Sequence, residues 1–229
     1  MNLYAANVHA HPLIDPSDFF RHKNDTILNE EEQKTCEGSL TEKECLAALK
    51  TMETGKTPGS DGLSVEFYKV FWQDTSKPLI RALNFSYDIG CLSITQRRGI
   101  IKLIPKRETE PHYIKNWRPL TLLSCDYKLG AKSIAIRLKN VLPSTISYDQ
   151  TGFIKGRFTG KNIRLIDSVI RFAKERNIPG LLLFLDFEKG FDTIECPFIT
   201  KTLQYFRFGP SMINWIKCFY RNIRKLCLE

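Results

Sequence analysis

The chain has 229 residues, of which 42 % are hydrophobic and 26 % are charged, and its net charge is +9. This usage suits a globular protein that can bury a sizeable core, and no apolar run is long enough to span a bilayer. The first residues lack the basic and apolar regions of a secretory signal. We therefore expect an intracellular protein of the nucleus or cytoplasm, with no membrane partner and with no oligomeric state indicated.

The basic charge is unevenly distributed along the chain. Residues 1–65 contain 6 Lys and Arg against 11 Asp and Glu, a net of −5, whereas residues 97–176 contain 18 against 6, a net of +12. A basic stretch is the electrostatic footprint expected of a polyphosphate partner, and it is equally what a solvated protein face looks like. Charge alone leaves both interpretations open.

The N-terminal part predicts a leader followed by helices. Residues 1–40 contain prolines and an acidic run but no sustained hydrophobic period, so we expect them to be loosely organised. Thr41 and Glu44 have the spacing of a helix capping box, and that helix should end before Gly55. An aromatic helix is predicted after the turn KTPGSDG, and another over residues 78–90.

The middle of the chain predicts a strand pair and two amphipathic helices. Two short strands are expected at GIIKLIPK (99–106) and NWRPLTLL (116–123). Apolar residues recur at helical spacing in 126–142 and 161–176, which predicts helices with that face inward and basic residues such as Arg137 elsewhere around the helix. Between them lies a glycine-punctuated basic loop, YDQTGFIKGRF. Further amphipathic segments are predicted over residues 197–207 and 211–225.

The stretch LLLFLDFEKGFDTIECP (181–197) combines a hydrophobic segment with two aspartates, Asp186 and Asp192. Its first seven residues are typical of a strand covered on both faces. At the end of such a strand the sheet would fix Asp186, and the following loop would leave it accessible. A metal-binding role and a turn or helix-capping role both stay open for Asp186 and Asp192.

Three chemistries could use a carboxylate at the end of a strand. A phosphohydrolase that forms an aspartyl-phosphate would want a second acid two residues on and then a small hydroxyl residue, but Glu188 is followed by Lys189 and Gly190. A glycosidase would need a second carboxylate across a groove, which one sequence cannot place. Two-metal phosphoryl transfer suits the basic middle of the chain best.

From about Thr41 to its last residue, the chain resembles the reverse transcriptases of non-LTR retrotransposons of the long interspersed element type. One motif of this kind is a weak signal, whereas several in the same order are a strong one. The motifs, in order, are KTPGSDGLSVEFYK (56–69), GIIKLIPK (99–106), NWRPLTLLSCDYKLGAKSIAIRL (116–138), DQTGFIKGR (149–157), NIRLI (162–166) and LDFEKGFD (185–192).

This resemblance implies an RNA-directed DNA polymerase that extends a DNA primer on an RNA template, using dNTPs and Mg²⁺. Asp186 would bind both Mg²⁺ ions, the carbonyl of Phe187 would add a ligand, and Phe191 would be the steric gate that favours dNTPs. Lys106 and Arg118 would hold the incoming triphosphate, a task that suits an ammonium and a bidentate guanidinium.

By the same resemblance, four residues of the basic loop would lie next to the template as nucleic-acid-binding residues: Gln150, Gly152, Phe153 and Arg157. Simpler structural roles are open for the other implied residues. Lys106 could be a solvated cation at a strand end, Arg118 could pack its guanidinium on Trp117, and Phe191 could be a core aromatic.

The implied fold class is α+β, the right-hand polymerase fold, with only the fingers and the first part of the palm in this truncated chain. Residues 1–40 would be the leader, residues 41–178 the fingers-like region, and residues 179–229 an incomplete palm. Gly190 stands where family members commonly have Ala, which loosens the backbone after Asp186.

The chain contains no adjacent pair of aspartates, whereas the family's polymerases use one. Two Mg²⁺ ions held close together need several negative ligands. We therefore expect the 229-residue chain alone to be inactive, and template-dependent dNTP incorporation that Asp186→Ala abolishes would contradict this expectation. A non-catalytic nucleic-acid-binding module and a non-functional retrotransposon relic are the alternatives.

Overall fold

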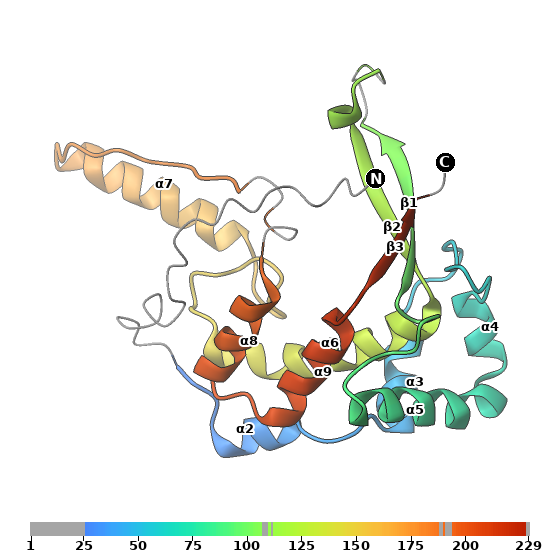
Figure 1. Cartoon of the computed structure of the whole chain (residues 1–229). Coiled ribbons are helices and arrows are strands. Elements are labelled where there is room, and N and C mark those ends of the chain that lie inside the picture. Colours follow the sequence, from blue (N-terminus) through green and yellow to red (C-terminus); the bar gives the residue numbers. More distant parts are fainter. Residues whose placement is uncertain (1–25, 107–109, 111, 188–189, 191–193, 228–229) are drawn as a thin grey trace. The chain divides into compact units, whose positions relative to one another are not determined.

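The computed structural model describes residues 26–106, 110, 112–187, 190 and 194–227 (Figure 1). The chain divides into two compact units, which are described here one at a time. The larger unit comprises Glu30–Val141 and Gly209–Glu229, and the smaller comprises Met1–Asn29 and Leu142–Phe208. These boundaries differ from the predicted ones after residues 40 and 178. The described residues form helices and one three-stranded sheet, which is an α+β composition.

Many of the predicted elements are present with different ends, whereas the helix Glu30–Thr35 and the strand Arg224–Cys227 were not predicted and residues 181–187 do not form the predicted strand. The larger unit holds α2 (Glu30–Thr35), α3 (Glu42–Lys50), α4 (Val65–Val70), α5 (Trp72–Asp88), β1 (Arg98–Pro105), the 3-10 helix η1 (Ile114–Asn116), β2 (Trp117–Leu123), most of α6 (Cys125–Thr145), α9 (Pro210–Tyr220) and β3 (Arg224–Cys227). The smaller unit holds the end of α6, α7 (Gly160–Glu175) and α8 (Cys196–Tyr205). No helix among these described elements is long and apolar enough to cross a membrane.

Helix α3 begins where the sequence predicts. The Thr41 side chain accepts a hydrogen bond from the backbone N–H of Glu44, and the Glu44 carboxylate accepts one from the backbone N–H of Thr41, which confirms the capping box. The helix ends at Lys50, before Gly55. Pro78, by contrast, lies inside α5, which begins at Trp72 and not at the proline.

Residues 30–40 are part of the fold and not a loose leader. They form α2 and a turn in which Cys36 and Leu40 are buried. The Glu37 carboxylate accepts hydrogen bonds from the backbone N–H groups of Ser211 (2.9 Å) and Met212 (3.2 Å), so it caps the N-terminus of α9. The leader prediction is therefore wrong for this part. Residues 1–25 lie outside the described residues.

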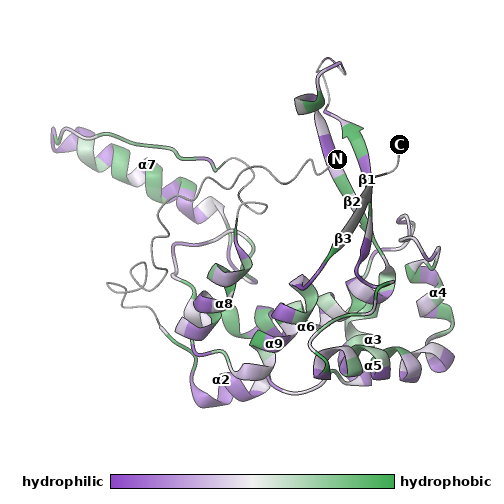
Figure 2. Cartoon of the chain, viewed as in Figure 1, coloured by the Kyte–Doolittle hydropathy of each residue, from purple (hydrophilic) through white to green (hydrophobic). Residues whose placement is uncertain are grey.

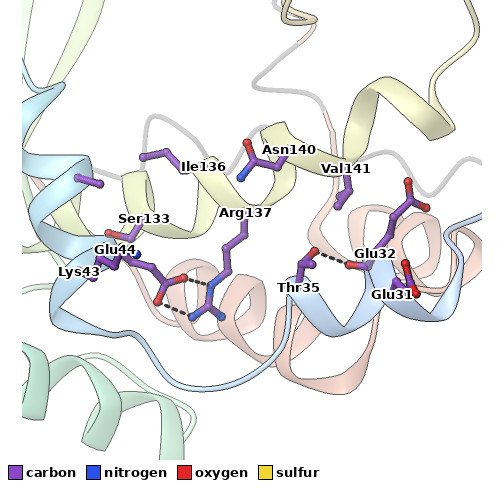
Figure 3. Close-up of a pocket in the computed structure, with 11 residues that line it drawn as sticks. Glu31, Glu32, Thr35, Lys43, Glu44, Ser133, Ile136, Arg137, Asn140 and Val141 are labelled. Carbon is purple, nitrogen blue, oxygen red and sulfur yellow. Dashed lines mark hydrogen bonds and ion pairs between the residues drawn. The ribbon is translucent and has the colours of Figure 1, made fainter.

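Arg137 of α6 ties this turn to the core, although the sequence placed it away from the apolar face. Its side chain is only 6 % exposed, and it donates to the Glu44 carboxylate at 2.6 and 3.0 Å. Its remaining bonds go to backbone carbonyl oxygens, at 3.3 Å to Cys36 and Glu37 and at 2.8 Å to Gly38 and Ser39. A buried guanidinium is tolerated here because its N–H groups find acceptors (Figure 3).

An aromatic stack forms the centre of the larger unit. The rings of Tyr87 and Trp215 stack at 4.6 Å, and those of Trp215 and Phe219 stack at 6.0 Å. The Trp215 indole N–H donates to the carbonyl of Gly38 at 3.1 Å, so its polar atom is satisfied. The stack thus joins α5 and α9 to the turn that Arg137 holds.

The sheet has the order β2, β1, β3. Strand β1 pairs antiparallel with β2, which confirms the predicted strand pair, and parallel with β3. The sequence predicted a helix over residues 211–225, but α9 ends at Tyr220 and is followed by strand β3. The turn 56–62 lies directly against the junction of β2 and α6. A side chain at Gly59 would place its Cβ 2.5 Å from the Ser124 backbone, so only glycine fits.

The apolar face of α7 and the run 181–187 differ most from prediction. Helix α7 has no buried residue, although the sequence predicted an inward face, and Figure 2 shows hydrophobic positions along it. The run 181–187 is not a strand, and its side chains are exposed. A strand needs a neighbour for its backbone N–H and C=O groups, and no described strand pairs with this run.

Candidate functional site

The β1–β2 hairpin brings the two predicted triphosphate-binding cations together. Arg118 lies opposite Ile104 in the ladder, and the backbone N–H of Lys106 continues the ladder by donating to the carbonyl of Asn116 at 2.7 Å. Residues two apart on a strand share a face, as do residues that lie opposite each other. Lys106 and Arg118 are therefore diagonal neighbours on one face of the hairpin.

This face of the hairpin is open. Arg118 is exposed, and so are Ile104 and Leu120, which lie on the same face. Trp117 precedes Arg118 in the strand, and successive strand residues point to opposite faces, which argues against simple packing of the guanidinium on the indole. Arg118 is thus an exposed cation on this face, and the half-buried Lys106 lies diagonal to it.

The residues predicted to bind metal lie in the smaller unit. Asp186 and Phe187 are in the exposed run, and the Phe187 side chain is 81 % exposed. Phe191, the predicted gate, and Asp192 lie outside the described residues. No group of three or more His, Cys, Asp or Glu side chains that could hold a metal ion occurs in the part of the chain that the structure describes. Asp186 alone does not fit a two-ion magnesium site, which needs more carboxylates.

The four predicted nucleic-acid-binding residues share one loop of the smaller unit. Gln150 is exposed and donates from its side-chain amide to the carbonyl of Gly152 at 3.2 Å, while Phe153 is 93 % exposed. Arg157 donates to the backbone carbonyls of four residues around the end of α6: Pro143, Ile146, Ser147 and Gln150. The structure thus gives Arg157 a loop-closing role, and its nucleic-acid contact stays a prediction.

Two further residues of this loop were not singled out from the sequence, and Lys161 at the start of α7 lies beside one of them. Tyr148 and Phe158 are exposed aromatics, and the Lys161 ammonium donates to the Tyr148 hydroxyl at 2.7 Å. This hydrogen bond and the positive charge of Lys161 hold the pKa of Tyr148 below its usual value. A signal was present in the sequence, because aromatic residues recur every five positions through a basic segment (Tyr148, Phe153, Phe158).

A cavity of about 660 Å³ lies in the larger unit between α2, α3 and α6 (Figure 3). Arg137 and Glu44 line it together with Glu31 and Glu32, and none of the predicted site residues does. Because the guanidinium of Arg137 is already paired with Glu44 and with backbone carbonyls, it is not available to a ligand. The cavity is therefore not the candidate site.

Comparison with known proteins identifies the class to which this fold and these residues belong. Residues 104–227 match the family described as reverse transcriptase (RNA-dependent DNA polymerase). The chain belongs to this family. The matched stretch contains Lys106, Arg118 and Asp186 together with the basic loop, so the resemblance predicted from sequence motifs is confirmed.

One relative is similar over most of the chain. The uncharacterised 149 kDa protein of transposon TX1 from Xenopus laevis is 37 % identical over 194 residues, which cover 85 % of the chain. The same alignment covers 15 % of that relative, so the chain spans only a small part of its length. The similarity extends beyond the 124 residues matched by the family, since it covers 194.

Proposed function

We propose that the chain forms the fingers and the first part of the palm of a non-LTR retrotransposon reverse transcriptase, in the right-hand polymerase fold. Such an enzyme is an RNA-directed DNA polymerase that extends a DNA primer on an RNA template. The observation that carries the proposal is the single family match that includes Lys106, Arg118 and Asp186. The transposon origin of the 37 % identical relative supports the retrotransposon part.

The hairpin face is the proposed site for the triphosphate of the incoming dNTP. An ammonium and a guanidinium on one face neutralise a polyphosphate tail, and the guanidinium can also orient it with two parallel hydrogen bonds. Fixing that tail positions the nucleotide for in-line attack by a primer 3′-hydroxyl, which is the main task of a phosphoryl-transfer enzyme. Lys106 and Arg118 are thus proposed as substrate-binding residues.

Asp186 is proposed as one oxygen ligand of catalytic Mg²⁺, with the carbonyl of Phe187 as another. The metal would supply charge neutralisation at the phosphate that is transferred. The described residues do not complete such a site, so polymerisation is proposed for the domain to which the chain contributes, and not for the chain alone. Phe191 is proposed as the gate that crowds a ribose 2′-hydroxyl.

Lys106→Ala and Arg118→Ala are each expected to weaken dNTP binding by about 10- to 100-fold. The reason is that a hydrogen bond to a charged group contributes roughly 1.5–3 kcal/mol, and each 1.4 kcal/mol is tenfold in affinity. Binding is measured by fluorescence anisotropy of a labelled dNTP with the purified chain and Mg²⁺.

The matched control is Arg81→Ala, which removes an exposed cation of α5 in the same unit. Arg81→Ala is expected to leave the affinity within about twofold of the wild type, because α5 does not contribute to the hairpin face. If all three variants bind dNTP as tightly as the wild type, the hairpin is not the dNTP site. If all three lose affinity equally, the loss is due to the change in net charge and not to the hairpin.

A non-catalytic nucleic-acid-binding module is the second candidate. It is favoured by the net charge of +12 over residues 97–176, which suits a polyphosphate partner without requiring chemistry. RNA binding that weakens with salt and is unchanged by Asp186→Ala, in a chain that binds no dNTP, would support this candidate over the polymerase.

A further inference from the structure

The loop between α6 and α7, residues 146–159, is held in one shape by its own polar groups. Arg157 closes it onto the end of α6 through backbone carbonyls, with bonds of 2.8 Å to both Ile146 and Gln150. The side chain of Asn162 donates to the carbonyl of Asp149 at 3.0 Å and thereby joins the loop to α7. A loop fixed in this way loses little conformational freedom when a ligand binds to it.

Three aromatic side chains of this fixed loop are exposed. Phe153 is 93 % exposed, Tyr148 is 70 % exposed and Phe158 is 67 % exposed. Phe153 also has a φ of 63°, a left-handed conformation that non-glycine residues rarely adopt and that costs free energy. Phe158 lies so close to Gly160 that a Cβ there would be 2.2 Å from the ring. Exposed aromatics on a preorganised and strained loop indicate a binding role.

The aromatic side chains are interleaved with positive charge. Residues 147–164 contain four Lys and Arg and a single acid, Asp149. The Lys161 ammonium lies 5.0 Å from the centre of the Tyr148 ring and the Arg157 guanidinium 5.8 Å from it, so both cations lie beside this aromatic. Lys155 and Arg164 are exposed as well. The surface thus offers flat apolar faces and cations together.

We propose that Tyr148, Phe153 and Phe158 form a stacking platform for unpaired bases of RNA, with Lys155 and Lys161 neutralising the adjacent phosphates. The platform rests on the proposed function, since it names how the template strand would be held, and it adds Tyr148, Phe158 and the two lysines to the predicted loop contacts. Every base has a π-face that can stack on an aromatic ring, and every nucleotide carries one negative charge.

The chemistry of the surface favours single-stranded nucleic acid over other partners. A double helix keeps its bases stacked on one another, so its phosphates could meet the lysines but its bases could not reach the rings. A protein partner would need a contiguous apolar patch or groove, whereas here two of the three rings are followed within three residues by a cation, at Lys155 after Phe153 and at Lys161 after Phe158. The platform is therefore expected to prefer single strands and to tolerate different sequences.

The experiment measures the affinity of the full chain for a 5′-labelled 12-nucleotide oligo(U) by fluorescence anisotropy, with a duplex RNA of the same length alongside. Tyr148→Ala, Phe153→Ala and Phe158→Ala are each expected to weaken oligo(U) binding by about 5- to 100-fold, the range of one lost base stack. Tyr148→Phe keeps the ring and is expected to bind within about threefold of the wild type.

The matched control is Phe85→Ala, which removes an exposed phenylalanine from α5 and should leave the affinity unchanged. Lys155→Met with Lys161→Met is expected to lower the slope of log affinity against log salt by about 1.4, since each single-strand phosphate contact contributes roughly 0.7. Circular dichroism and thermal unfolding of each variant test that the fold is retained, as expected for exposed side chains.

The platform is overturned if the wild type does not bind oligo(U) at micromolar concentration in 50 mM salt, or if it binds the duplex equally well. It is also overturned if the aromatic variants bind like the wild type, or if Phe85→Ala weakens binding as much as they do. The dNTP measurement on the hairpin is independent of this outcome. A chain that binds dNTP through Lys106 and Arg118 but has no platform would remain a polymerase fragment whose template is held elsewhere.

Discussion

Arg137→Met is expected to lower the free energy of unfolding of the larger unit by about 3–5 kcal/mol, the cost of breaking a buried ion pair by removing one partner. The variant leaves the Glu44 carboxylate without its cation and deprives the carbonyls of Gly38 and Ser39 of their 2.8 Å hydrogen bonds. Methionine has a similar shape, so the loss reports the polar contacts and not a cavity. Urea unfolding followed by tryptophan fluorescence measures it, because Trp215 lies beside the same turn.

Two other variants separate the parts of this effect. Lys139→Met removes an exposed cation two residues along α6 and is expected to change stability by less than about 0.5 kcal/mol. Glu44→Gln keeps the bonds from Arg137 to the turn and is expected to cost less than Arg137→Met. A loss below about 1 kcal/mol for Arg137→Met would show that the turn is held by other contacts.

The stability difference between wild type and Arg137→Met is expected to depend on pH in one direction. Burial raises the pKa of Glu44, but hydrogen bonds from Arg137 and Thr41 outweigh burial and lower the pKa below its ordinary value of 4.5. A carboxylate whose pKa is lowered on folding stabilises the folded state above the ordinary value, and this stabilisation is lost as the pH falls through the folded-state pKa. The difference in the free energy of unfolding between wild type and Arg137→Met should therefore be largest above pH 4.5. It should become smaller as the pH falls below this value.

The purified chain is expected to self-associate through the run 181–187, and Leu183→Lys is expected to raise its soluble monomer concentration several-fold. Leu181 is 93 % exposed, and Leu183, Phe184, Leu185 and Phe187 are exposed with it. A hydrophobic run of this length without a partner strand is a template for pairing with another copy, and one lysine interrupts such pairing. Sedimentation velocity at increasing protein concentration measures the effect.

Val70→Lys is the matched control, because it makes the same charge change at an exposed apolar residue at the end of α4. If Val70→Lys raises the monomer concentration as much as Leu183→Lys, added charge and not the run 181–187 is responsible. A wild-type chain that stays monomeric at all accessible concentrations would contradict the prediction directly. It would mean that the run is covered in solution.

Local signals in the sequence predicted much of the fold. The capping box of Thr41 and Glu44 is a contact across three residues, and the strand pair 99–106 and 116–123 lies close in sequence, so both are decided by nearby residues. The two long helices α6 and α7 were found from their periodicity. What periodicity could not decide is which faces are covered, because burial depends on neighbours that are distant in the sequence.

Long-range contacts account for the errors. Arg137 was placed away from the apolar face because a basic residue is normally exposed, yet its acceptors lie about 100 residues earlier in the chain. The run 181–187 was predicted as a strand from composition, but a strand forms only with a partner, and none is present among the described strands. For the site, the motifs named Lys106 and Arg118 separately, and the ladder register showed that they share a face.

The turn 36–39 carries a further consequence for how sequences of this kind vary. The Arg137 guanidinium binds backbone carbonyl oxygens of this turn, which most amino acids could supply equally well. Residue identity matters at three positions: Cys36 is buried, Gly38 has a φ of 88° that favours glycine, and the Glu37 carboxylate binds the N-terminus of α9. An inserted or deleted residue, in contrast, would shift every oxygen out of reach of the guanidinium. In this turn, the number of residues is therefore expected to be constrained together with the identity of Cys36, Glu37 and Gly38.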